Sequence, residues 1–395
     1  MTGFTRDRLT WTAYVVLGWF AYLQAAPGLV VPHLRQELEL SYSTGGLFVT
    51  AFAAGSTVAG LLSGRLERVL GRRNLLWCGA AVLACGTVGL VGGGTAGLTL
   101  SAVLVMGFGG GLVLATIQAV LSDHHGDLRS VALTEVNVAA SCGYLLLVGA
   151  LTLAAQLDAG WRIVLVGSLI VPALMWWQSR SQPIEDPTQS HASRDGRLPP
   201  AFWVVAAILA CTTAVEWSIT AWGATFVQEM TRVSADTAVS LMAGYFGGFL
   251  LGRVLGSRLA RRKEPASLLG AAMALTAVGF AVVWTSTDPV VAVPGLVLLG
   301  AGIGNLFPMT VSVAVGVAPE QAAKVSGRAV AASAGAILLA PVTIGALADA
   351  TSLRTALAIV PILLAVSAAG LVLLRHLSRR SGSGQRVGDQ PHLFG

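Results

Sequence analysis

Apolar stretches separated by short polar breaks repeat along the chain from about residue 12 to residue 376. A helix needs roughly 20 apolar residues to cross the hydrocarbon core of a bilayer. Twelve stretches are long enough: 12–34, 43–64, 74–92, 96–121, 130–156, 160–178, 201–229, 235–260, 265–285, 289–316, 324–347 and 353–376. The first is too long for a signal peptide and lacks a small-residue cleavage site, so we expect it to remain in the mature protein. The pattern predicts an all-α polytopic membrane protein with twelve transmembrane helices.

Composition supports this prediction, and the distribution of charge orients it. Hydrophobic residues make up 54% of the chain and charged residues only 11%. Cytoplasmic loops of membrane proteins hold an excess of Lys and Arg. With the N-terminus inside, every Lys and Arg except Arg35, Arg162, Arg232 and Arg354 lies at a cytoplasmic end or loop. We therefore predict a multi-pass protein of the cell membrane with both termini in the cytoplasm. Its net charge of +6 favours contact with anionic membrane lipids, and no nucleic-acid-binding motif is present.

An internal repeat divides the chain into two halves. A shift of about 193 residues aligns Ser41 with Ser234 and Gly107 with Gly300. Such a repeat predicts that a unit of six helices was duplicated in the same orientation. The expected organisation is a six-helix bundle over residues 1–178, a polar cytoplasmic linker over 179–200, a second pseudo-symmetric bundle over 201–377 and a disordered cytoplasmic tail over 378–395.

The loop between the second and third spans carries a recognisable motif. It reads GRLERVLGRR, and Gly64, Leu66, Gly71, Arg72 and Arg73 match the signature loop G-x-L-a-D-R-x-G-R-R of the major facilitator superfamily. The chain departs from the signature at one point, because Arg68 stands at the position of its Asp and the acidic Glu67 lies one residue earlier.

The resemblance covers essentially the whole chain. The parallel repeat of six plus six helices is the plan of these transporters, in which the solute site lies near the bilayer midplane between the halves. The stretches AVEWSITAWGATFV (214–227) and GGFLLGRVLGSRLARR (247–262) resemble most closely the fucose-permease-like bacterial facilitators. The acid that such proton-linked sugar transporters carry in the first helix is missing here, and only Gln24 is polar at that depth.

Glu216 is the central candidate for chemistry, because it lies in the middle of the apolar stretch from Ala201 to Val227. A carboxyl group at this depth costs on the order of 2.5 to 3.5 kcal/mol on insertion scales, so it usually faces a cavity and serves a transported ion or solute. We predict that Glu216 carries the coupling proton.

The family resemblance implies that the first, fourth, seventh and tenth spans line the cavity. Their polar and aromatic residues are the predicted solute-binding set: Tyr22, Gln24, Gln118, Trp222 and Asn305. Trp217 is the weaker candidate, because it follows Glu216 by one residue and therefore points about 100° away around the helix.

Two ion pairs are predicted as inner gates between the halves. Glu135 in the fifth span and Arg253 in the eighth lie at similar depth, and the resemblance implies that these helices flank each other. We expect this pair to form in the outward-open state and to separate when the protein opens inward. Glu67 is likewise expected to meet Lys324 or Arg328 at the start of the eleventh span.

These observations predict a monomeric secondary transporter that needs no cofactor. Asp123, His124 and His125 are interpreted as a solvated loop rather than a metal site, since ligands must converge with supporting groups around them. No ATP-binding motif GxxxxGK[ST] occurs, and no cluster typical of an enzyme lies in the spans. Two mechanisms remain open for the small organic solute: proton symport of a sugar-like metabolite, and export of a drug or natural product by proton antiport. A membrane-embedded enzyme or a receptor is a less favoured alternative.

Overall fold

The computed structural model describes residues 4–180, 184, 198–317 and 321–386. Within these residues the chain forms helices, turns and loops, with no β-strand. The α-helices are α1 (Arg8–Glu37), α2 (Tyr42–Leu70), α3 (Arg72–Gly92), α4 (Ala96–His125), α5 (Arg129–Gln156), α6 (Gly160–Gly167), α7 (Ile170–Ser179), α8 (Pro200–Thr231), α9 (Ala235–Leu259), α10 (Pro265–Thr285), α11 (Pro289–Val317), α12 (Ala322–Ala350), α13 (Leu353–Ala356) and α14 (Ile359–Arg386), and a 3₁₀ turn, η1 (Gly126–Leu128), precedes α5.

Twelve spans of these helices are long and apolar enough to cross a membrane, which confirms the prediction from hydropathy. The sixth span is interrupted between α6 and α7, and the twelfth begins with the short helix α13. The last helix, α14, continues to Arg386, so it extends past residue 377, where the final span was expected to end.

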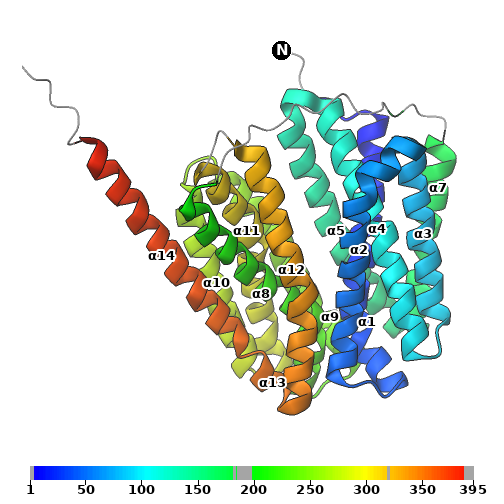
Figure 1. Cartoon of the computed structure of the whole chain (residues 1–395). Coiled ribbons are helices and arrows are strands. Elements are labelled where there is room, and N and C mark those ends of the chain that lie inside the picture. Colours follow the sequence, from blue (N-terminus) through cyan, green and yellow to red (C-terminus); the bar gives the residue numbers. More distant parts are fainter. Residues whose placement is uncertain (1–3, 181–183, 185–197, 318–320, 387–395) are drawn as a thin grey trace, which may run out of the picture.

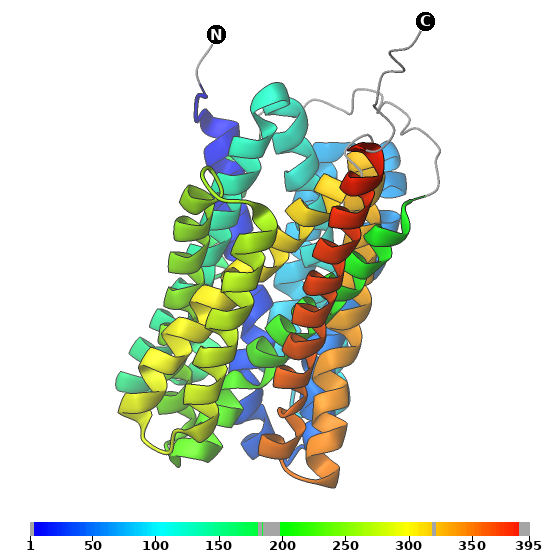
Figure 2. The ribbon, with the colours of Figure 1, turned by 90° about the vertical axis from the view of Figure 1, so that its left-hand side faces the viewer.

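The helices before and after the segment 181–197 lie side by side (Figure 1). We call α1–α7 the N-terminal set and α8–α14 the C-terminal set. The two sets meet mainly at three helix pairs: α1 contacts α8, α2 contacts α12, and α5 contacts α9. Figure 2 shows the beginning of α1 and the end of α14 at the same end of the molecule. This end is called the terminal end, and the opposite end is called the far end.

The same helix crossing occurs in both sets at positions 193 residues apart. A Cβ atom on Gly107 of α4 would lie 2.0 Å from the Phe52 carbonyl oxygen of α2, and one on Gly300 of α11 would lie 1.9 Å from the Tyr245 carbonyl oxygen of α9. Only glycine permits such close backbone contact, which is how helices associate in lipid. The crossing agrees with the repeat in the sequence.

Candidate functional site

A small cavity lies between the two sets at mid-depth. Its walls come from α1, α5, α8 and α9, and its lining residues are Gln24, Ala25, Tyr144, Glu216, Trp217, Thr220, Tyr245, Phe246 and Phe249. Only about 10 Å³ of it admits the centre of a water molecule. This is about the space that one water needs, so the cavity is nearly closed.

Glu216 lies halfway along α8 and contributes its side chain to the cavity wall. Its carboxylate forms no hydrogen bond or ion pair with any residue that the structure describes. The polar groups around it are bonded to one another: the Tyr144 hydroxyl donates to Gln24 Oε1 at 2.8 Å, and the hydroxyls of Thr220 and Tyr245 lie 3.3 Å apart. Ionising a desolvated carboxyl group that has no hydrogen-bond partner is costly. The group is therefore suited to bind a proton or to accept a hydrogen bond from a polar solute.

Of the predicted solute-binding set, Gln24 is the residue that the structure places in this cavity. Tyr22 donates to the Val164 carbonyl oxygen at 3.1 Å, and Asn305 donates to the Gly252 carbonyl oxygen at 2.7 Å.

The two remaining members also lie away from the cavity. The buried Trp222 ring donates through Nε1 to the Pro341 carbonyl oxygen at 2.9 Å, and Gln118 is exposed. The prediction named the helices expected to line the cavity, but it could not identify which face of each helix points into it. These four side chains lie on other faces of their helices.

The cavity also contains residues that the sequence analysis did not select. Tyr144 lies on α5, and Tyr245 and Phe249 lie on α9. They were missed because only the first, fourth, seventh and tenth spans were considered, although aromatic residues in the middle of α5 and α9 were a visible signal. Trp217 also lines the cavity, which corrects the argument that one residue of separation from Glu216 turns it away.

The predicted gate pair, Glu135 and Arg253, is not formed in this structure. Arg253 reaches α5 at the Asn137 carbonyl oxygen (3.3 Å) and the Ser141 hydroxyl (3.2 Å). Residues 137 and 141 are one turn apart and share a face, whereas Glu135 is turned about 200° from residue 137 at 100° per residue. Glu135 therefore faces away from Arg253.

Glu135 instead joins the N-terminal segment to α5. Its carboxylate accepts hydrogen bonds from Arg6 at 2.6 and 2.8 Å and from the Tyr14 hydroxyl at 2.9 Å. Nearby, Asp7 caps α1 by accepting from the Thr10 amide at 2.9 Å and contacts His124 Nε2 at 2.8 Å. Partial burial acts to raise the pKa of Asp7, but the hydrogen bonds from Thr10 and the contact with His124 together hold it below its ordinary value.

The signature loop contains an ion-pair network around one buried arginine. Arg72, whose side chain is 6% exposed, pairs through Nε with the Glu67 carboxylate and through Nη2 with Asp123 at 2.7 Å. Glu67 thus supplies an acid to this loop although Arg68 occupies the position of the signature Asp. Asp123, expected to be solvated, is one of its partners.

The second predicted gate is also not formed in the part of the chain that the structure describes. Glu67 is bound to Arg72, and the exposed Arg328 lies over the Trp203 ring at 5.8 Å. The side chain of Lys324 lies outside the described residues.

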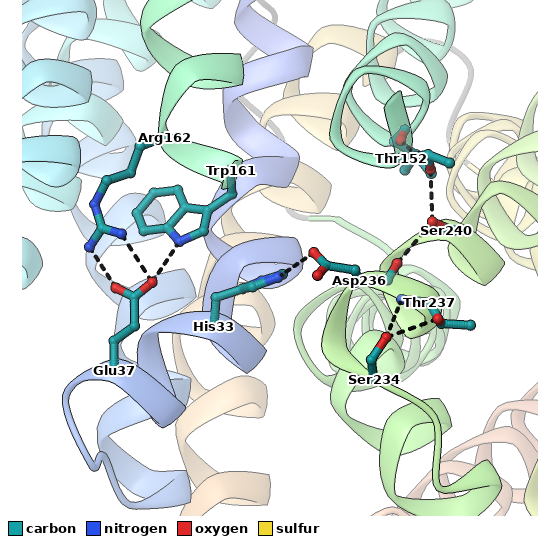
Figure 3. Close-up of polar contacts among 10 residues, drawn as sticks. His33, Glu37, Thr152, Trp161, Arg162, Ser234, Asp236, Thr237 and Ser240 are labelled. Atoms are coloured by element: carbon teal, nitrogen blue, oxygen red, sulfur yellow. Dashed lines mark hydrogen bonds and ion pairs between the residues drawn. The ribbon is translucent and has the colours of Figure 1, made fainter. Parts of the chain in front are cut away.

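Several polar contacts join the N-terminal set to the C-terminal set at the far end (Figure 3). His33 Nε2 lies 2.9 Å from Asp236 Oδ1, and the Thr152 hydroxyl donates to Ser240 at 3.0 Å. Beside them, Glu37 pairs with Arg162 and accepts from Trp161 Nε1 at 3.1 Å within the N-terminal set.

Further cross-set contacts involve the start of α2. Asp349 of α12 accepts from the backbone amides of Tyr42 and Ser43 at 2.7 and 2.8 Å, and the Tyr42 hydroxyl donates to Glu229 of α8 at 2.5 Å. Arg35 lies over the Tyr42 ring at 3.6 Å. We call the contacts of His33, Tyr42 and Ser43 with Asp236, Glu229 and Asp349 the far-end latch. Sequence reasoning missed it because these residues lie at helix ends, where polar side chains are ordinary.

No group of three or more His, Cys, Asp or Glu side chains suited to a metal ion occurs among the described residues. His125 contacts the Thr10 hydroxyl at 2.9 Å, and its neighbours Asp123 and His124 are bound to Arg72 and Asp7. The Asp-His-His sequence therefore ties helix ends together.

Comparison with solved structures finds the same fold in several transporters. A bacterial homologue of the human lysosomal transporter Spinster, solved in an inward-facing and occupied conformation, is 14% identical, with a TM-score of 0.76 over 95% of this chain and 98% of that chain. The nucleoside transporter NupG is 13% identical (TM-score 0.75; 93% and 100% covered), and a D-xylose-proton symporter is 16% identical (TM-score 0.75; 92% and 96% covered).

No curated protein matches the chain in sequence. The model of the Major Facilitator Superfamily, however, matches residues 10–329 and again residues 232–393. The chain therefore belongs to the major facilitator superfamily and is a membrane transporter rather than an enzyme.

Proposed function

We propose that this secondary transporter couples the movement of a small polar, sugar-like solute to protons, with Glu216 as the proton-carrying group. The observation that carries the proposal is a carboxylate on the wall of a midplane cavity without a fixed partner among the described residues. Low dielectric favours the neutral acid, and an approaching solute or water favours the ionised form. The group can therefore change its protonation state as the cavity opens and closes.

The lining of the cavity supports a solute with hydroxyl groups. Gln24, Tyr144, Thr220 and Tyr245 present an amide and three hydroxyls, and Trp217 offers an aromatic wall. Binding sites commonly combine an apolar lining with a few polar groups that orient the ligand. The D-xylose-proton symporter and the nucleoside transporter with the same fold act on solutes rich in hydroxyls, which favours this class here.

Proton antiport of a lipophilic cation is the second candidate. Trp217, Phe246 and Phe249 surround Glu216, and aromatic faces with a carboxylate attract organic cations. A thermal-shift panel of pentoses, hexoses, nucleosides and lipophilic cations, followed by vesicle transport of each hit, separates the two. Uptake into vesicles with an alkaline interior supports symport, whereas uptake into vesicles with an acidic interior supports antiport.

We further propose that the structure represents a state closed at the far end, in a monomer built from two rigid bundles, residues 1–178 and 201–377. The far-end latch supports this, because it joins α1 and α2 to α8, α9 and α12 on one side of the cavity. The Spinster homologue of the same fold was solved in an inward-facing conformation. In this assignment the terminal end is cytoplasmic and the far end is external, as the distribution of Lys and Arg favours.

The proposed topology predicts the reactivity of a cysteine in the linker. With both termini inside, a Gln189→Cys protein in intact cells will not react with an impermeant maleimide, but will react after the membrane is permeabilised. Gln189 itself lies outside the described residues. The matched positive control is Asp288→Cys, between α10 and α11 at the far end, which should react in intact cells. Equal labelling of the two positions in intact cells would contradict the topology.

The far-end latch predicts a shift in accessibility when one acid is neutralised. Asp349→Asn removes a charge that holds the amides of Tyr42 and Ser43. Loss of roughly 1 kcal/mol, an ordinary value for one hydrogen bond, should raise the outward-open population about fivefold. The measurement is external labelling of a cysteine introduced at Gln24 in the cavity.

The matched control for this experiment is Asp288→Asn. Asp288 also accepts from a backbone amide, that of Val290 at 2.8 Å, but within the C-terminal set. The Asp288→Asn substitution should leave external labelling of the cysteine at position 24 unchanged. A rise of the same size in both variants would show that the latch does not control access.

A further inference from the structure

We propose that the N-terminal set binds an anionic phospholipid of the surrounding membrane in a pocket separate from the Glu216 cavity. The pocket has a volume of about 650 Å³ and lies between α1, α5, α6 and α7. Most of its wall is apolar or aromatic, from residues that include Trp11, Val15, Trp19, Leu146 and Ile163. The size is in the range of roughly 300–1,000 Å³ that is ordinary for a ligand site.

The pocket opens at the edge of the protein that faces lipid. Trp11, Val15, Leu146 and Ile163 are 55%, 39%, 67% and 60% exposed although they line it. The span made by α6 and α7 is peripheral, with 11% of its apolar window buried, against 78% for α1. The molecules that reach this opening in a bilayer are lipids.

Local backbone structure creates the space. Gly143 of α5 crosses α1 so closely that a Cβ atom there would lie 2.1 Å from the Gly18 carbonyl oxygen. Beside this crossing, the break between α6 and α7 leaves a gap in the pocket wall that these two helices form. Gly167 at the end of α6 has no side chain that could fill the gap. A Cβ atom on Gly167 would meet nothing within 4 Å.

The polar atoms in the pocket wall are already satisfied. Trp19 Nε1 donates to the Ser168 hydroxyl at 3.3 Å, the Tyr22 hydroxyl donates to the Val164 carbonyl oxygen, and the Tyr14 hydroxyl donates to Glu135. What remains is apolar surface without hydrogen-bonding demand. Such a wall suits an acyl chain, whereas a polar solute would lose its hydration without compensation.

Positive charge at the terminal end of the pocket selects the headgroup. Arg8 is exposed, lies one turn before Trp11 on α1, and donates to the Gln178 carbonyl oxygen at the end of α7. Arg180 lies over the Trp177 ring at 4.5 Å. Neither arginine forms an ion pair with a residue that the structure describes. Both guanidinium groups lie at the terminal end of the pocket, and arginine binds a phosphate with paired hydrogen bonds.

The test measures bound lipid and does not depend on transport. Purified protein in detergent receives equal amounts of phosphatidylglycerol and phosphatidylcholine, and native mass spectrometry counts the lipids that remain. We expect retention of phosphatidylglycerol by the wild type. Gly167→Phe should reduce it, because the ring projects into the open space beside α6 where the acyl chain would lie. Arg8→Gln should lower the preference for phosphatidylglycerol about fivefold, the effect of one basic residue near an anionic lipid.

Two matched controls accompany these variants. Gly149→Phe also places a ring where a Cβ atom meets nothing, but outside the pocket. Arg375→Gln removes another exposed arginine that donates to a carbonyl oxygen, that of Ala266. Both should retain lipid as the wild type does. If Gly167→Phe fails to fold by thermal melting, Gly167→Leu replaces it.

Other results overturn the proposal. Undiminished phosphatidylglycerol on a folded Gly167→Phe or Gly167→Leu protein would exclude the pocket. Equal loss in the Arg8 and Arg375 variants would exclude specific headgroup recognition. A dimer that Gly167→Phe disrupts would show that a second copy, rather than a lipid, covers this face.

Discussion

Vesicles that contain the Glu216→Gln protein should fail to accumulate solute when a pH gradient is applied, while solute exchange continues. The amide keeps the size and hydrogen-bonding capacity of the carboxyl group but cannot release a proton. For symport of one proton with one solute, a gradient of one pH unit supports accumulation up to about tenfold, since tenfold corresponds to about 1.4 kcal/mol. The variant should reach only the external concentration. Exchange need not return a proton and should persist.

Stability separates this prediction from a structural role for Glu216. The carboxyl group has no hydrogen-bond or ion-pair partner among the described residues, so its replacement by a neutral amide breaks no hydrogen bond or ion pair and removes the free-energy cost of ionising a desolvated group. The melting temperature of Glu216→Gln should equal or exceed that of the wild type. Glu264→Gln, at an exposed acid between α9 and α10, is the control and should accumulate solute normally. Proton-driven accumulation by a folded Glu216→Gln protein would refute the proposed role.

Neutralising Arg72 should cause the largest loss of stability among these variants. Its buried guanidinium group bridges Glu67 at the end of α2 and Asp123 near the end of α4. Removing one partner of a buried ion pair typically costs 3–5 kcal/mol, because the remaining charge stays desolvated. Asp123 is 43% exposed, and solvent screening there reduces the cost. For Arg72→Gln we therefore expect a loss of about 3 kcal/mol, measured by chemical unfolding in mixed micelles.

The neighbouring Arg73 provides the control for Arg72. It belongs to the same motif but is exposed, so Arg73→Gln should change the free energy of unfolding by less than about 0.5 kcal/mol. The triple variant Glu67→Gln, Arg72→Gln, Asp123→Asn should recover part of the loss, because no unpaired charge remains. If the triple variant is less stable than Arg72→Gln alone, the ion-pair explanation is wrong.

The signature loop shows how far a motif predicts a site. The motif located Arg72 and identified Glu67 as a displaced acid, and the structure pairs these two residues. It gave no indication of Asp123, which lies on another helix. The partner across space depends on how α4 ends beside α2 and α3, and this is a property of packing.

Hydropathy by itself determined the number of spans and the depth of Glu216, because both follow from the cost of placing a residue in lipid or water. The residues that align after a shift of about 193 indicated the repeat. Only the tertiary structure decided which side chains meet at the depth of Glu216. Glu135 contacts Arg6 rather than Arg253, Gln24 lies beside Tyr144, and Trp222 packs against Pro341. The rotation of a helix about its axis changes these contacts without changing the depth of any residue, so the pattern of apolar positions could not specify them. Close packing between helices, including glycine contacts at single positions, fixes that rotation.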